Sequence, residues 1–397
     1  MPAHFPYPPI RTMLAGLLFA LPNMAHATPY IPANGAQVIE RLPSRSDPTQ
    51  RELGRLRAGL AKTPDNLPLA AALARRYIEQ ARIEGDPRYL GYAQAVLAPW
   101  WKQPQPPSAV LLLRATLLQS THQFAAALAD LDTVLKQDSG NAQAWLTRAT
   151  VLLVTGDYAA AKASCMRLYS RAPVLVIQTC LANVGSVGGQ AEQSYATLKT
   201  ALEKNQDADP GIKIWVLTLL AEMATRQGDV VAAQKYFASA LAFDGADSYL
   251  LGAYSDFLLD RGRAPEVVTL LKDKTRVDAL LLRYALALKA TNSPQAPRQT
   301  EVLRARFDAA MLRGDTVHQR EQARFELILR NDAKTAVKLA KLNWAIQKEP
   351  ADLRILLESA AAANDKAAAQ DALDWVKKTG LEDRALSVLL KQMSAPT

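Results

Sequence analysis

Apolar and small residues recur along most of the chain at spacings of three and four, in segments a few turns long separated by short polar turns. Such spacing places one apolar stripe along a helix. The segments follow one another in pairs, which predicts helical hairpins. A single hairpin is too small to bury its own apolar face, so we expect consecutive hairpins to stack against one another.

The turns inside these pairs share a pattern. "TGDYAAAK" (155–162) and "QGDVVAAQ" (227–234) each place Gly-Asp between two helical segments, and "THQFAAAL" (121–128) has His122 where the others have glycine. Glycine readily ends a helix, and an aspartate after it accepts backbone N–H groups at the start of the next. We therefore expect one helix to end and another to begin at each of these turns.

The pattern has a period of 34 residues in its most regular part. Aligning the segment from Ala109 with that from Gln143 places Ala115 on Ala149 and Phe124 on Tyr158. The same offset places Ala127 on Ala161. Alanine at Ala149 and Ala161 is expected where two helices cross, since a larger side chain would push the pair apart. A fixed period of this length is typical of helical repeat arrays.

The chain resembles the tetratricopeptide repeat superfamily. The resemblance rests on a signature-like set of Trp145, Ala149, Gly156, Tyr158, Ala161 and Pro173, and on Phe237, Ala240 and Leu241 in a later unit. It implies an all-α fold: a right-handed solenoid of stacked antiparallel helix pairs (a TPR-like array) with a C-terminal capping helix.

The pattern divides the chain into seven parts. They are a cleaved signal peptide (1–27), an extended or disordered lead (28–63), an atypical helix pair with a proline-rich linker (64–107), the regular array (108–275), an irregular helix pair (276–320), C-terminal TPR-like repeats (321–380), and a capping helix with a tail (381–397).

The first 27 residues have the order of a secretory signal peptide. Arg11 is followed by the apolar run 12–21 and by Ala25-His26-Ala27, which carries small residues at the expected cleavage positions. The run is shorter than the about 20 residues that cross a bilayer. We predict cleavage after Ala27 and export, to the periplasm of a Gram-negative-type envelope or, alternatively, out of the cell. No later apolar run is long enough to span a membrane.

Composition and charge add little that is specific. Hydrophobic residues make up 49% of the chain, dominated by alanine and leucine, as in close-packed helices. The formal charge of +9 arises from 47 basic and 38 acidic residues interleaved along the helices, which favours a mixed, solvated surface. Basic residues lack the interleaved aromatic residues of a nucleic-acid site, so we expect no nucleic-acid partner.

The residues needed for catalysis or metal binding are scarce. Two of the four histidines lie in the leader, and His122 and His318 are far apart in sequence, which argues against a zinc site or a histidine-based catalytic centre. The glycine-rich "NVGSVGGQ" (183–190) lacks the Lys-Ser/Thr of a phosphate loop. We expect no catalytic residues, no metal and no cofactor.

Cys165 and Cys180 are the only cysteines. They fall on the second helix of one unit and the first helix of the next, which are neighbours in a stacked array. An exported protein meets an oxidising environment, so a disulfide is one interpretation. Two small buried thiols are the other.

In the superfamily that this chain resembles, the first helices line a concave groove that holds peptides or partner helices. Transferring that register selects eleven groove residues: Gln143, Thr147, Thr150, Thr179, Asn183, Trp215, Thr218, Glu222, Arg226, Tyr249 and Asp256. Trp215 and Tyr249 are either aromatic anchors for a partner or fillers between units.

This register leads to the prediction of a non-catalytic adaptor that binds peptide segments or partner proteins of the cell envelope. Two alternatives stay open. One is a carbohydrate or small-ligand binder that uses Trp100 and Trp101. The other is an accessory enzyme with a site hidden in residues 28–107 or 290–320.

Overall fold

The computed structural model describes residues 34, 36, 47–243, 245 and 247–394. The chain divides into two units, residues 1–51 and 52–397, and the first contributes little more than the start of helix α1 (Pro48–Lys62) to the described residues. The predicted signal peptide and its cleavage site after Ala27 lie outside the described residues. All regular secondary structure in the described part of the chain is helical, without a strand.

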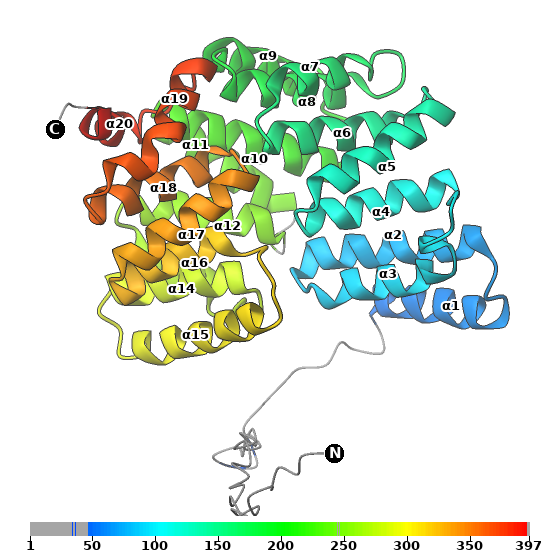
Figure 1. Cartoon of the computed structure of the whole chain (residues 1–397), viewed down its shortest axis with the longest axis horizontal. Helices are drawn as coiled ribbons and strands as arrows, with labels where there is room; N and C mark the ends of the chain where they lie inside the picture. Colours follow the sequence, from blue (N-terminus) through cyan, green and yellow to red (C-terminus); the bar gives the residue numbers. More distant parts are fainter. Residues whose placement is uncertain (1–33, 35, 37–46, 244, 246, 395–397) are drawn as a thin grey trace, which may run out of the picture. The chain divides into compact units, whose positions relative to one another are not determined.

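The second unit is an all-α, right-handed solenoid of stacked antiparallel helix pairs (Figure 1). The pairs are α2 (Leu67–Glu84) with α3 (Arg88–Trp101), α4 (Ser108–Ser120) with α5 (Phe124–Gln137), α6 (Ala142–Val154) with α7 (Tyr158–Met166), α8 (Val174–Val187) with α9 (Ala191–Glu203), α10 (Pro210–Gln227) with α11 (Val230–Phe243), α12 (Ser248–Leu259) with α13 (Ala264–Leu271), and α14 (Asp278–Ala290) with α15 (Ala296–Leu312).

The remaining elements follow α15. They are α16 (Gln319–Arg324), the π-helix η1 (Phe325–Arg330), α17 (Ala333–Ile346), α18 (Pro350–Ala362), the 3₁₀-helix η2 (Lys366–Ala369), α19 (Gln370–Thr379) and α20 (Ser387–Ser394). Helix α20 packs against α18 and forms the C-terminal cap.

The recurring turns have the local chemistry that the sequence predicts. Gly156 (φ 83°) and Gly228 (φ 79°) adopt the left-handed conformation, where glycine is not strained. The Asp157 carboxylate then accepts the Ala160 N–H at 3.0 Å, and Asp229 accepts that of Ala232 at 2.9 Å. His122 adopts the same conformation (φ 56°) although it is not glycine, so this turn keeps its geometry at some cost in backbone strain.

The alanines at the helix crossings are buried. Ala149 and Ala161 are 2% and 0% exposed and belong to one apolar cluster with Leu168 and Ile177. Every unit contributes such residues, so the apolar core runs along the array between successive hairpins.

The predicted lead over 28–63 is wrong at its end. Residues 48–62 form α1, and Leu53, which is 1% exposed, belongs to an apolar cluster with residues of α2. Leu53, Leu56 and Leu60 recur at helical spacing, a signal too short to separate from an irregular segment by pattern alone. The last helix likewise begins only at Ser387, because the Asp383 side chain first holds a turn by accepting the Ala385 N–H at 2.9 Å.

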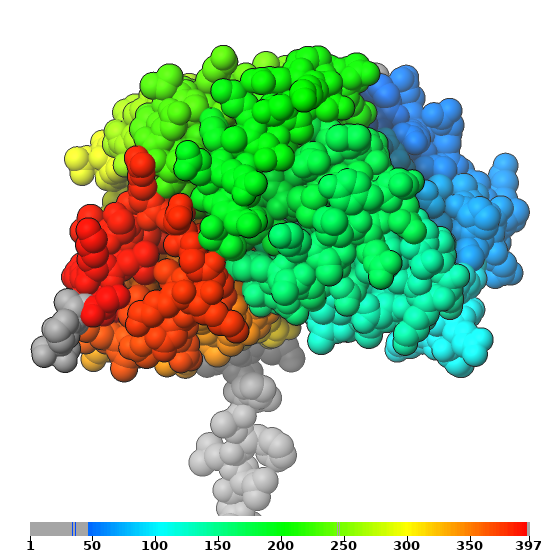
Figure 2. Space-filling model, turned by 90° about the horizontal axis from the view of Figure 1, so that it is seen from above, coloured from blue at the N-terminus to red at the C-terminus, as the bar shows by residue number. Residues whose placement is uncertain are grey.

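The C-terminal helices return to the middle of the array. The Lys348 N–H donates to the Val154 carbonyl at 2.8 Å, and the Arg384 N–H donates to the Arg226 carbonyl at 2.9 Å. Figure 2 shows the C-terminal helices, coloured red, directly beside the green middle of the array. Residues after 344 therefore cover the C-terminal ends of α6 and α10, which local sequence patterns do not predict.

Candidate interaction site on the first-helix face

The predicted groove residues all lie on α6, α8, α10 and α12, the first helices of four consecutive pairs. We call the surface that these helices share the first-helix face. Its residues fall into three groups. The first consists of buried threonines, and the second of half-buried or exposed side chains with few contacts. The third consists of charged groups that are joined to residues of later helices.

The prediction that three threonines line an accessible groove is wrong, since Thr147, Thr179 and Thr218 are 6%, 0% and 3% exposed. The Thr179 hydroxyl donates to the Leu175 carbonyl at 2.6 Å, and the Thr218 hydroxyl donates to Ile214 at 2.7 Å. Threonine side chains inside helices commonly make this bond to the preceding turn. These side chains therefore stabilise the packing and cannot reach a partner.

Five other predicted residues remain accessible to some degree. Gln143 is exposed and its amide donates to the Thr147 hydroxyl at 3.2 Å, while Thr150, Asn183, Trp215 and Arg226 are half-buried. The Arg226 guanidinium donates to the Ser186 hydroxyl at 3.1 Å and so links α10 to α8. These residues offer hydrogen-bonding groups beside the half-buried ring of Trp215.

Glu222 and Tyr249 meet on the first-helix face. The Tyr249 hydroxyl donates to the Glu222 carboxylate at 2.8 Å, and the Tyr249 side chain is still 62% exposed. Burial raises the pKa of Glu222. The charge of Glu222, followed by burial and the charge of Glu349, raises the pKa of Tyr249 well above its usual value. Tyr249 is thus an accessible residue whose hydroxyl lies among charged groups of α10 and of the residue that precedes α18.

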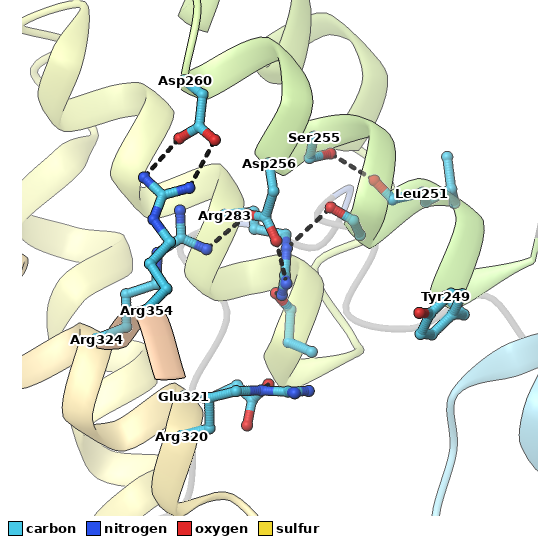
Figure 3. A network of polar contacts seen from close by, with 12 residues as sticks. Tyr249, Leu251, Ser255, Asp256, Asp260, Arg283, Arg320, Glu321, Arg324 and Arg354 are labelled. Atoms are coloured by element: carbon cyan, nitrogen blue, oxygen red, sulfur yellow. Dashed lines mark hydrogen bonds and ion pairs between the residues drawn. The ribbon is translucent and has the colours of Figure 1, made fainter. Parts of the chain in front are cut away.

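Asp256 is not a free groove residue. Its carboxylate pairs with Arg283 of α14 and Arg324 of α16, each at 2.5 Å (Figure 3). Burial opposes the charge of this carboxylate, but the two guanidinium groups outweigh burial and lower the pKa of Asp256 far below its usual value. The residue joins three helices, which makes it a structural ion-pair centre.

A second ion cluster faces the same surface from the C-terminal helices. The Arg320 guanidinium contacts Glu349 at 3.1 Å and both Asp352 and Glu321 at 3.3 Å. Burial and the neighbouring Asp352 raise the pKa of Glu349 to about 7, against the opposing effect of Arg320. Sequence reasoning missed these residues, because they lie where the 34-residue period has broken down.

The two cysteines form a disulfide. Cys165 of α7 and Cys180 of α8 have Cα atoms 5.7 Å apart and link successive units. Of the two interpretations of these cysteines, the structure therefore has the bonded one.

Features of other site classes are sparse in the described part of the chain. No group of three or more His, Cys, Asp or Glu residues there could hold a metal ion. No described helix is long and apolar enough to cross a membrane.

His122 is half-buried in the structure. Its ring stacks on Phe124 and its Nδ1 lies 3.1 Å from the Gln347 amide. Trp100 and Trp101 are half-buried and pack against the core of α2–α4.

Comparison with known families agrees with this architecture. A family model for the tetratricopeptide repeat matches residues 118–173. Over these residues the chain is similar to a tetratricopeptide repeat. No curated protein matches the chain significantly in sequence.

Among solved structures, the APC/C hetero-tetramer Cut9–Hcn1 is 12% identical, with a TM-score of 0.52 over 87% of this chain and 67% of that chain. The human IFIT1 dimer with m7Gppp-AAAA is 15% identical, with a TM-score of 0.46 over 88% of this chain and 87% of that chain. Yeast Tom70 is 12% identical, with a TM-score of 0.33 over 87% of this chain and 91% of that chain. The first of these supports the solenoid fold alone. The fold is that of a TPR-like scaffold, which suits protein–protein interaction.

Proposed function

We propose that the protein is an exported, non-catalytic scaffold that binds a segment of a partner protein of the cell envelope on its first-helix face, around Tyr249. The observation that carries the proposal is Tyr249, a residue that is 62% exposed and whose hydroxyl donates to Glu222. An exposed aromatic residue whose hydroxyl is held in place suits a contact that contributes much of the binding energy. Trp215 and Arg226 lie on the neighbouring α10 and extend the surface.

The charges around Tyr249 favour a basic partner segment. Glu222 forms no ion pair with a described residue, and Arg320 is shared by Glu321, Glu349 and Asp352. Burial raises the pKa of both Glu222 and Glu349, so their charged forms lack full compensation. A lysine or arginine side chain of the partner would supply the missing positive charge and gain a charge-assisted hydrogen bond.

Export is proposed from the order of Arg11, the apolar run 12–21 and Ala25-His26-Ala27. The disulfide is consistent with an oxidising compartment. N-terminal sequencing of the protein recovered from the envelope fraction tests the proposal directly. Material beginning at Thr28 supports it, and material beginning at Met1 contradicts it.

Site-specific crosslinking tests the binding surface. A photoreactive amino acid at Tyr249 should trap a partner in living cells, and one at Val231, which is 81% exposed on the second helix α11, should not. The crosslink should also weaken in a protein that carries Glu222→Gln, because the partner's basic side chain then loses its carboxylate, with helix content unchanged by circular dichroism. Equal trapping of the partner from both positions would contradict the proposal that the first-helix face is the binding surface.

A further inference from the structure

A cavity of about 400 Å³ opens between α5, α6 and α7, on side chains that the first-helix face does not use. Its lining is Asp132, Leu135, Lys136, Trp145, Arg148, Ala163, Ser164 and Arg167. The volume falls in the range of small-molecule sites. Two of its three walls are second helices, so an occupant here would not compete for the surface around Tyr249.

The cavity lies where one unit departs from the repeat. Arg114 and Arg148 are equivalent at the 34-residue offset. The Arg114 guanidinium forms two bonds, of 2.7 and 2.6 Å, with the carboxylate of Asp130 in its own unit. The residue equivalent to Asp130 in the next unit is Ser164, whose neutral hydroxyl accepts from Arg148 at 2.8 Å. Arg148 therefore has no carboxylate in its own unit of the kind that neutralises Arg114 in the preceding unit.

Arg148 receives only partial compensation from another unit. Its Nε donates to Asp132 at 2.8 Å, and the Asp132 side chain is 49% exposed. Two further cations border the cavity, because Lys136 and Arg167 form no ion pair with any described residue. Three positive charges thus face one half-exposed carboxylate, which leaves an excess of two positive charges at the cavity.

The cavity also has an apolar part. The Arg167 guanidinium carbon lies 5.6 Å from the centre of the Trp145 ring, and the Trp145 N–H is satisfied by the Ser139 carbonyl at 3.0 Å. Helix α7 ends at Met166, whereas the equivalent α5 continues to Gln137, and this early end leaves the space open. The adjacent disulfide of Cys165 ties the shortened helix to α8, so this wall is held in place.

We propose that this cavity binds a small molecule carrying a carboxylate or phosphate group on an aromatic body. Lys136, Arg148 and Arg167 would contact the anionic oxygens, for which arginine is well suited in geometry and charge. Leu135, Trp145 and Ala163 would contact the aromatic body, since stacking and burial favour it there.

The test uses the exported form of the protein with 5-fluorotryptophan, titrated with phenyl phosphate, benzoate and inorganic phosphate and followed by ¹⁹F NMR. Trp145→Phe assigns the Trp145 resonance. Both aromatic anions should shift that resonance in a saturable way, and inorganic phosphate should bind at least about tenfold more weakly because it lacks the apolar contact. Absence of a saturable shift with either aromatic anion, or equal affinity for inorganic phosphate, overturns the proposal.

Two variants localise the effect. Ser164→Asp copies the Arg114–Asp130 arrangement and should weaken binding of phenyl phosphate at least about tenfold by neutralising Arg148. Arg167 is exposed, so we expect Arg167→Gln to fold normally and to weaken binding of phenyl phosphate as well. The matched control is Lys199→Gln on α9, an exposed lysine outside the cavity, which should leave the affinity unchanged. If Arg167→Gln binds as tightly as the control, the cavity is not the site.

Discussion

Replacement of Asp256 by alanine should destabilise the protein through the charges it leaves behind. The Asp256 carboxylate contacts Arg283 and Arg324 at 2.5 Å each, and these arginine side chains are only 13% and 19% exposed. Asp256→Ala would leave both guanidinium groups together without their counter-ion. Removing one partner of a buried ion pair costs about 3–5 kcal/mol. Because Asp256 is itself 29% exposed and partly screened, we expect the lower end, about 3 kcal/mol.

Urea unfolding at pH 7, followed by circular dichroism, measures this loss. The matched control is Asp374→Ala, which removes an exposed carboxylate 3.6 Å from Lys377 and should cost less than about 1 kcal/mol. A triple variant that replaces Asp256, Arg283 and Arg324 with apolar residues should recover much of the stability, since no unpaired charge remains. Equal losses in Asp256→Ala and in the control would refute the assignment of Asp256 as an ion-pair centre.

The ion pairs of Asp256 with Arg283 and Arg324 also predict a pH dependence of stability with a defined sign. The pKa of Asp256 is lowered in the folded state, so its contribution is present above the unfolded pKa of about 4. That contribution is lost as pH falls toward the lower folded pKa. The stability difference between the wild-type protein and Asp256→Asn should therefore shrink as the pH is lowered from about 5 to about 3. A difference that grows over this range would contradict the sign.

Three further predictions concern other positions. Ala149→Leu should lower the free energy of unfolding by about 1–3 kcal/mol, because Ala149 is 2% exposed at a helix crossing. An unchanged urea midpoint would contradict the placement of Ala149 at a helix crossing. Cys165→Ser with Cys180→Ser should cost about 3 kcal/mol, as expected for a loop with a sequence separation of 15, and adding a reductant should reproduce that loss in the wild-type protein but not in the variant. Glu349 has a folded pKa of about 7, above its unfolded value of about 4, so its charge destabilises the folded protein as pH rises through this window. The stability of Glu349→Gln relative to the wild-type protein should therefore increase between pH 5 and pH 8, as measured by thermal unfolding at each pH.

The sequence by itself determined the helical hairpins, their stacking and the turns that join them. These features depend on neighbours within one period: Gly156 and Asp157 act on their own turn, and Ala149 acts on the helix that its hairpin supplies. The resemblance to tetratricopeptide repeats also identified which helices form the first-helix face. It did not tell which side chains are accessible there, because the burial of Thr147 and Thr218 depends on packing between units.

Only the tertiary structure decided what surrounds Tyr249 and Asp256. Arg324 is 68 residues from Asp256 in sequence, and Gln347 is 225 residues from His122, yet both pairs are in contact. Such contacts depend on the curvature that many small rotations between units accumulate, and no local pattern encodes that sum. For this reason the C-terminal helices, which the sequence describes as one more stretch of repeats, supply the charges that face the middle of the array.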